Sequence, residues 1–140
     1  MHNPVAIFIY NRPEKVISLL ESIVTNKNFR EFNYYIFSDG PKKRGDFKNV
    51  RRCRDLVNDF FKNLKCEFHF SKENKGLSSS IISGVTHVLK TNHTVIVLED
   101  DLVLHEYFFQ YMNYFLNKFK TNTNVYSING HMYKDDKLLP

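Results

Sequence analysis

Strand and helix patterns alternate along almost the whole of this 140-residue chain, and this alternation restricts the folds open to it. Runs rich in β-branched and aromatic residues predict strands, and apolar residues three or four positions apart predict helices. The predicted strands are residues 5–10, 34–38, 66–70, 95–98 and 125–128, the third less buried than the others. The predicted helices are residues 13–26, 47–64, 77–89 and 107–119. This order is typical of an α/β fold, a Rossmann-like and mostly parallel sheet with helices on both faces.

Length and composition indicate one globular domain over residues 1–140. The 42% hydrophobic and 25% charged fractions are ordinary for such a domain, and no apolar run is long enough to cross a bilayer. The N-terminus lacks the basic segment of a signal peptide, so we interpret it as the first strand. Cys53 and Cys66 have no spacing typical of a zinc site, so we expect reduced thiols in a cytosolic protein.

The net charge of +5 comes partly from two basic runs, Lys42-Lys43-Arg44 and Arg51-Arg52-x-Arg54. Such runs are most often a solvated helix face. They also suit attraction to anionic phosphates or to an acidic membrane surface. A nucleic-acid surface is a third interpretation, although no recognised nucleic-acid motif accompanies the charge.

Three carboxylates, Glu99-Asp100-Asp101, directly follow the apolar run Val95-Ile-Val-Leu98. In open α/β sheets, ligands bind in the crevice beyond the carboxyl ends of the strands. Adjacent carboxylates repel one another, so the cluster needs a cation partner. A hard divalent ion that also bridges substrate phosphates would supply it. The alternative is structural, because acidic residues also cap helix N-termini.

Three more polar motifs fall at the same predicted edge. Asn11-Arg12 follows the first strand; the Arg12 fork suits a phosphate or a base edge, and Asn11 is expected to cap the next helix in a capping box with Glu14. Ser38-Asp39-Gly40 could accept from a ribose hydroxyl or a base N–H. Glu73-Asn74-Lys75-Gly76 brings a helix N-terminus, a glycine and a lysine, which suit a diphosphate. Each motif alone also has a structural interpretation: Arg12 as a solvated first-turn residue, Ser38-Asp39-Gly40 as an Asx turn, and the 73–76 segment as a capped loop.

The motifs together resemble a known family. A hydrophobic strand and N-R-P precede F-S-D-G, then E-N-x-G-L-x-x-S-x-x-x-G-V, then V-L-E-D-D-L with F-F-x-Y downstream. This pattern is similar to GT-A glycosyltransferases, most of all the N-acetylglucosaminyltransferase I type and its bacterial relatives near family 2. The likeness runs over essentially all 140 residues. Its most specific part is the E-D-D segment with F-F-x-Y, which resembles the family's variant of the D-x-D motif.

The resemblance implies roles for the residues that match the motifs. Asp101 would coordinate Mn²⁺ or Mg²⁺, and the ion would hold the diphosphate of a nucleotide sugar. Glu99 and Asp100 would face the ribose or the donor sugar. Asp39 would lie where the family reads the base, and Arg12 where it contacts the nucleotide. The donor-side loop and its neighbourhood would be formed by Asn11, Asn74, Lys75 and Gly76.

The chain departs from the family pattern in two places. Many members carry an arginine in the helix after the N-x-G loop, where this chain has Ser78-Ser79-Ser80, so Lys75 is a candidate substitute for diphosphate contact. The family usually continues well past the acidic motif into a segment that binds acceptor and carries the general base. We therefore expect this chain to be the donor-binding portion of such an enzyme, without that C-terminal part. Asp135 and Asp136 are the only acids in the tail after residue 130, and no residue is assigned as the catalytic base.

The sequence thus predicts a metal-dependent glycosyltransferase that moves a sugar from a nucleotide-diphosphate donor to an acceptor hydroxyl with inversion. A UDP-sugar is the favoured donor, and the acceptor is an unidentified glycan or lipid-linked glycan. We expect a cytoplasmic protein, with peripheral association at the inner face of the membrane as a further hypothesis, and no nucleic-acid partner. One alternative is a non-catalytic nucleotide-binding module. The other is a basic α/β protein that binds nucleic acid, which would show salt-sensitive binding.

Overall fold

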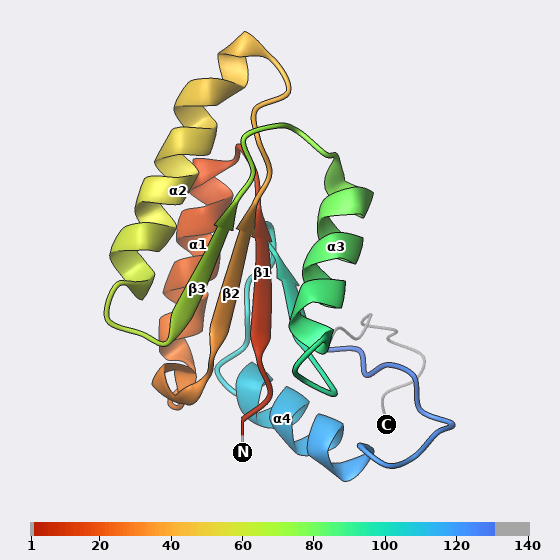
Figure 1. Ribbon diagram of the computed structural model, residues 1–140. Coiled ribbons are helices and arrows are strands. Elements are labelled where there is room, and N and C mark those ends of the chain that lie inside the picture. The colour runs from red at the N-terminus through yellow and green to blue at the C-terminus, as the bar shows by residue number, and fades with distance from the viewer. Residues whose placement is uncertain (1, 131–140) are drawn as a thin grey trace, which may run out of the picture.

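The computed structural model describes residues 2–130 as a parallel sheet with helices on both faces, which confirms the predicted fold class (Figure 1). The strands are β1 (Val5–Ile9), β2 (Tyr34–Ser38), β3 (Cys66–Phe70) and β4 (Ile96–Glu99). The helices are α1 (Pro13–Thr25), α2 (Phe47–Phe61), α3 (Leu77–Leu89) and α4 (Phe108–Lys118), with 3₁₀ turns η1 (Phe29–Glu31) and η2 (Arg44–Asp46). Within this part of the chain, no helix has the length and apolar character needed to cross a membrane.

The sheet has the strand order β3-β2-β1-β4, and every neighbouring pair is parallel. In register, Ile7 of β1 lies opposite Ile36 of β2 and Leu98 of β4. All five residues of β1 are buried, as expected for a central strand covered on both faces. The edge strand β3 is only partly buried, as the sequence predicted.

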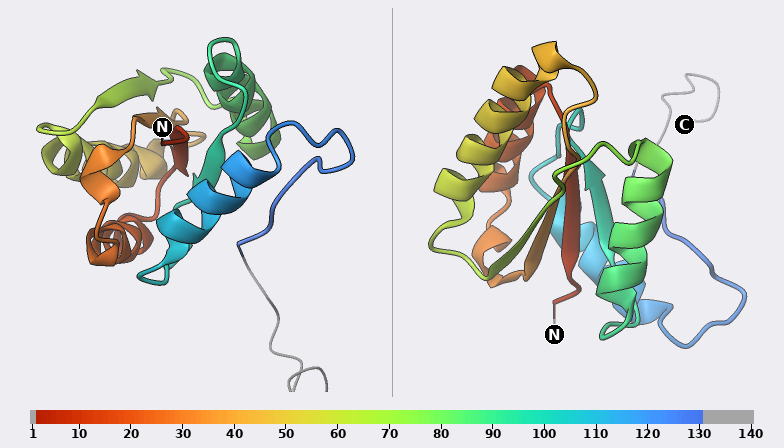
Figure 2. Two further views of the ribbon diagram at one scale, coloured as in Figure 1. Left: turned by 90° about the horizontal axis from the view of Figure 1, so that it is seen from below. Right: turned by 45° about the horizontal axis from the view of Figure 1, so that its top comes forward.

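Side chains that alternate along β1 divide the core into two layers. Ile7 and its neighbours on one face pack against α1, α2 and α4, whereas Ala6 and Phe8 face α3 (Figure 2). Gly84 lets α3 approach the sheet closely, because a Cβ there would lie 2.6 Å from Cε1 of Phe8. The two layers leave the carboxyl ends of the strands uncovered by helix bodies, at the top of Figure 1.

Helix α4 is held by the buried side chain of Asn26, just after α1. Its Oδ1 accepts the N–H of Phe109 at 3.0 Å, and its Nδ2 donates to the carbonyl oxygen of His105 at 3.2 Å. Phe109 in turn stacks on Phe32 with ring centroids 4.8 Å apart. Since buried amide groups are costly to leave unpaired, Asn26 fixes where α4 begins.

Two local predictions are wrong. Residues 125–128 form no strand, because their V-Y-S-I alternation finds no sheet partner: Tyr126 is 95% exposed, and Ile128 packs only partly against the core. The N-cap position of α1 is Arg12, and no side-chain cap bond forms there among the described residues. The helix begins one residue later than a cap at Asn11 requires, and the Asn11 side chain donates to Asp46 Oδ1 at 3.0 Å, a charge-assisted hydrogen bond.

Candidate functional site

The chain reverses its course across the sheet between β3 and β4. From β1 it adds β2 and β3 on one side, and α3 then carries it back to β4 on the other side of β1. This reversal places α1 and α2 on one face of the sheet and α3 on the other, and ligands in such folds usually bind beyond the carboxyl ends of the strands at the reversal point. The predicted motifs Asn11-Arg12 and Glu99-Asp100-Asp101 lie at these two neighbouring strand ends.

Arg12 lies between two of the three carboxylates. One guanidinium nitrogen donates to Asp100 Oδ1, and the other donates to Asp101 Oδ2 at 3.3 Å. Asp100 is only 3% exposed, and its second oxygen accepts the N–H of Tyr10 at 3.2 Å. Burial lowers the pKa of Arg12, but the hydrogen bond to Asp100 and the charges of both aspartates outweigh it and raise this pKa. Arg12 therefore supplies part of the positive charge that the acidic cluster needs.

Glu99 and Asp101 differ from Asp100 in what their oxygens contact. Both oxygens of Asp100 are engaged, whereas Asp101 is 45% exposed and only its Oδ2 has a partner among residues 2–130. Glu99 is half-buried, and no hydrogen bond to its side chain is found in the same part of the chain. Carboxylate oxygens are the ligands that Mg²⁺ and Mn²⁺ prefer, so Asp101 and Glu99 fit such an ion. Asp100 fits a different role, the positioning of Arg12.

Asp39, at the end of β2, holds the loop that leads into α3. Its carboxylate accepts the N–H groups of Gly40, Lys75 and Gly76 at 2.8–3.1 Å, and is 9% exposed. Asn74 donates to the carbonyl oxygen of Gly40 at 2.8 Å. Gly76 has φ +80°, a conformation that favours glycine. A Cβ on Gly40 would lie 2.5 Å from the backbone of Glu73, so the two loops fit together only around glycine.

Arg54 of α2 secures the same strand ends, although its basic run was interpreted as solvated. Its Nε donates to Ser38 Oγ at 2.9 Å, and Nη2 donates to the carbonyl oxygen of Ser71 at 2.7 Å. Its guanidinium lies 5.0 Å from the centroid of the Phe70 ring. Burial lowers the pKa of Arg54, and the nearby charge of Asp39 opposes this shift. The sequence carries no signal for this role of Arg54, because its partners Ser38 and Ser71 lie at the ends of β2 and β3, far from it in the chain.

A cavity of about 310 Å³ is lined both by the ends of β1 and β4 and by the loop that leads into α3. Among the predicted residues it is lined by Arg12, Asp39, Asn74, Gly76, Glu99 and Asp100. Lys42 also lines the cavity, although its basic run was interpreted as a solvated helix face. The apolar part of its wall comes from Phe8, Phe37 and Leu77. An apolar cavity with a few convergent polar groups is the ordinary form of a small-molecule site.

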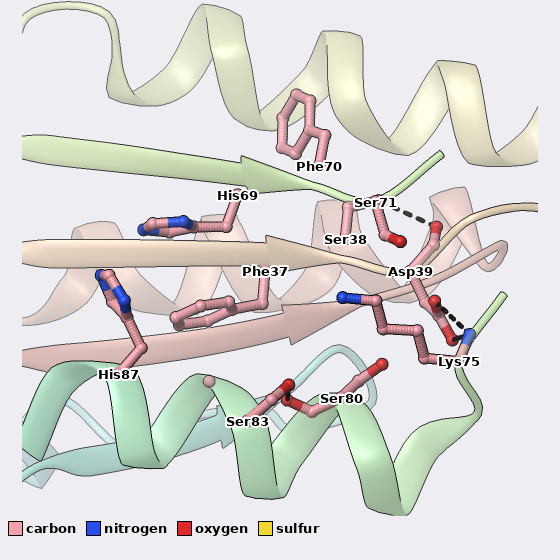
Figure 3. Close-up of a pocket in the computed structure, with 11 residues that line it drawn as sticks. Phe37, Ser38, Asp39, His69, Phe70, Ser71, Lys75, Ser80, Ser83 and His87 are labelled. Carbon is pink, nitrogen blue, oxygen red and sulfur yellow. Dashed lines mark hydrogen bonds between the residues drawn. The ribbon is translucent and has the colours of Figure 1, made fainter. Parts of the chain in front are cut away.

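Three predicted residues do not line this cavity: Lys75, Asn11 and Asp101, the last of which is hydrogen-bonded to Arg12. The Lys75 side chain lines a second cavity, which Asp39 also lines (Figure 3). Asn11 faces Asp46, which also accepts from the Tyr10 hydroxyl at 2.8 Å. The Tyr10 hydrogen bond is the largest cause of a lowered pKa for Asp46, with burial opposing it. Asn11 therefore braces the loop after β1 against η2 and does not reach the cavity lining.

No protein-family model matches the chain, and no curated protein matches it. Among solved structures, the chain is similar to S. aureus TarS 1–349 in complex with UDP, with TM-score 0.63 and 15% identity over 86% of this chain. A second TarS 1–349 structure gives TM-score 0.63 and 14% identity over 96%. The mannosyltransferase PcManGT from Pyrobaculum calidifontis, in complex with GDP-Man and Mn²⁺, gives TM-score 0.47 and 16% identity over 72%.

The chain spans only part of these proteins: the matches cover 33% and 40% of the two TarS chains and 28% of the mannosyltransferase chain. At such low identities, the likeness to TarS is a likeness of fold. The chain has a parallel, Rossmann-like α/β fold similar to that of the TarS structures.

Proposed function

We propose that this chain is the donor-binding portion of a glycosyltransferase that uses a nucleotide-diphosphate sugar. The observation that carries the proposal is the cavity at the ends of β1 and β4, which combines Arg12, Lys42, Glu99 and Asp100 with an apolar wall. Asp101 adjoins it through its hydrogen bond to Arg12. Cationic and anionic groups side by side suit a diphosphate together with its metal ion. The fold shared with TarS, whose structure includes UDP, supports UDP as the nucleotide.

In this proposal Asp101 and Glu99 would hold Mn²⁺ or Mg²⁺, which neutralises charge on the leaving diphosphate. Arg12 uses only some of its five N–H donors on the aspartates, so it can also donate to phosphate oxygens. Asp100 keeps Arg12 in place. Asp39 and Asn74 fix the wall against which the nucleoside packs, and Lys42 adds positive charge at the rim.

The transfer itself is proposed to be an inverting, direct displacement at the anomeric carbon by an acceptor hydroxyl. It needs a general base, and we assign none within residues 2–130. Asp135 and Asp136 lie outside the described residues. The acceptor is proposed to be a glycan or a lipid-linked glycan, and the net charge of +5 suits an acidic membrane surface on the cytoplasmic side.

Calorimetric titration of UDP with and without Mn²⁺ tests the proposal. We expect Mn²⁺ to strengthen UDP binding, and Asp101→Asn to weaken the metal-dependent affinity by about 10–100-fold, the usual cost of disturbing a metal site. Asp55→Asn is the matched control, because Asp55 is an exposed acid of α2, and it should bind as the unsubstituted chain does. An unchanged metal-dependent affinity in Asp101→Asn would contradict the metal assignment. UDP binding without any turnover or hydrolysis of a UDP-sugar would instead identify a non-catalytic binding module.

A further inference from the structure

A second cluster of metal-ligating side chains lies between β3 and α3, away from the acidic cluster. Glu67 and His69 are two residues apart on β3 and so share one face of the sheet. His87, in the last turn of α3, faces them. Nε2 of His69 lies 2.8 Å from Oε1 of Glu67, and Nε2 of His87 lies 3.4 Å from the same oxygen. One ligand atom from each residue lies within 4.8 Å of the others.

The two imidazoles are held in place by aromatic neighbours. His69 stacks on Phe37 with ring centroids 4.8 Å apart and 13° between the planes. His87 meets the edges of Tyr35 and Phe37 at 6.4 and 6.3 Å, and its ring centroid is 4.5 Å from that of His69. Figure 3 shows both rings at one end of the cavity that also contains Lys75. The donor atoms are therefore arranged before any ligand arrives.

One polar atom in the cluster is left without a hydrogen bond. Nε2 of His69 is buried, and no hydrogen-bond partner for it is found among residues 2–130. Glu67 is close enough, at 2.8 Å, but the pair is not aligned for a hydrogen bond. A buried nitrogen in this state is costly, and a metal ion at the centre of the cluster would satisfy it.

We propose that Glu67, His69 and His87 bind a divalent transition metal, with Zn²⁺ as the best fit. Two imidazole nitrogens and a carboxylate oxygen are a known zinc ligand set, whereas Mg²⁺ and Ca²⁺ prefer oxygen ligands throughout. Zinc bond lengths in a tetrahedral site place ligand atoms about 3.4 Å apart, close to the 3.4 Å between His87 and Glu67. The 2.8 Å between His69 and Glu67 would have to open to the same spacing.

The proposed ion would link β3 to α3 and would keep one coordination position open. The strand β3 is the sheet edge and pairs only with β2, so a metal would tie it to α3 as well. Three protein ligands leave the fourth tetrahedral position to water or a small anion. That position would face the adjoining cavity of about 340 Å³, which His69 and His87 line. This site is independent of the proposed function, because it uses none of the residues at the ends of β1 and β4.

Metal titration of the untagged, chelator-treated full chain tests the proposal. We expect one Zn²⁺ per chain by calorimetry, a rise in thermal midpoint, and the visible absorption bands of tetrahedral Co²⁺ when Co²⁺ replaces it. Losing even an outer-shell partner of a metal site costs about 10–100-fold in affinity, so His87→Gln and Glu67→Gln should each weaken binding by at least about 100-fold. His93→Gln, on an exposed histidine, is the control that should retain it.

His87 decides the test, because its side chain is 43% exposed and the variant should fold normally by circular dichroism. His69→Gln is a second variant, whose stack on Phe37 makes a stability check necessary. Equal Zn²⁺ affinity in His87→Gln and the unsubstituted chain would overturn the proposal. So would the absence of Zn²⁺ binding below millimolar concentration, which would identify the cluster as an ordinary histidine–glutamate ion pair.

Discussion

At the scale of single residues, Arg12 and Asp100 form the contact on which the site depends most. The Asp100 carboxylate is almost fully buried, and Arg12 is the only cationic side chain that contacts it among residues 2–130. A buried charge without a partner is far more costly than an exposed one. The pair also fixes the guanidinium at the mouth of the cavity, so one interaction serves both stability and ligand binding.

Arg12→Met should therefore destabilise the fold. We expect a loss of about 1–3 kcal/mol in the free energy of unfolding, the usual cost of leaving a buried acceptor unsatisfied. Arg52→Met is the matched control, since Arg52 pairs at 2.9 Å with the exposed Glu14, and such surface pairs are worth about 0–1 kcal/mol. The measurement is urea unfolding followed by circular dichroism.

A second substitution sharpens this test. In the double variant Arg12→Met with Asp100→Asn, the buried charge is gone, so part of the lost stability should return. If Arg12→Met costs no more than Arg52→Met, the pair does not hold the site together.

At the scale of secondary-structure elements, the approach of α3 to the sheet sets the shape of both cavities. Residues of α3 line the cavity beside the acidic cluster and the one beside the histidines. Gly84 permits this approach, with Phe8 and Phe37 directly beneath it. Any side chain at this position must push the helix outward or displace an aromatic ring, since the interior has no spare room.

Gly84→Ala should destabilise the chain, although alanine is intrinsically the better helix former by about 1 kcal/mol. The added Cβ would lie 2.6 and 2.8 Å from two atoms of the Phe8 ring, and overpacking of this kind costs about 1–3 kcal/mol. Gly45→Ala is the control, because nothing lies within 4 Å of a Cβ there. Thermal unfolding of the two variants gives the comparison. A Gly84→Ala midpoint at or above that of Gly45→Ala would show that α3 does not pack this closely.

The elements also show what sequence reasoning could and could not reach. Periodicity predicted all four strands and all four helices of the described residues to within three residues at each end, because burial in the core imposes the pattern. It failed at residues 125–128, where a strand-like pattern has no partner. It also failed for Asn11 and Arg54, whose partners lie 35 and 16 residues away. The glutamate–histidine cluster escaped notice because its ligands come from two elements and follow no metal-site spacing.

At the scale of the whole molecule, the fold carries two neighbouring clusters of different chemistry. The switch between β1 and β4 carries carboxylates and an arginine, which suit a hard ion and a diphosphate. The opposite sheet edge, at β3, carries imidazoles, which suit zinc. We propose that the first of these sites binds a nucleotide together with its metal ion.

Paramagnetic broadening by Mn²⁺ reports where the ion binds, and the His87→Gln variant is used so that the histidine cluster does not compete. We predict that small amounts of Mn²⁺ with UDP selectively broaden the backbone amide signals of Arg12 and Asp101, while UDP shifts those of Gly40 and Gly76. In Asp101→Asn this selective broadening should disappear. Signals at the ends of β1 and β4 that stay unchanged, or broadening confined to other parts of the chain, would contradict the account.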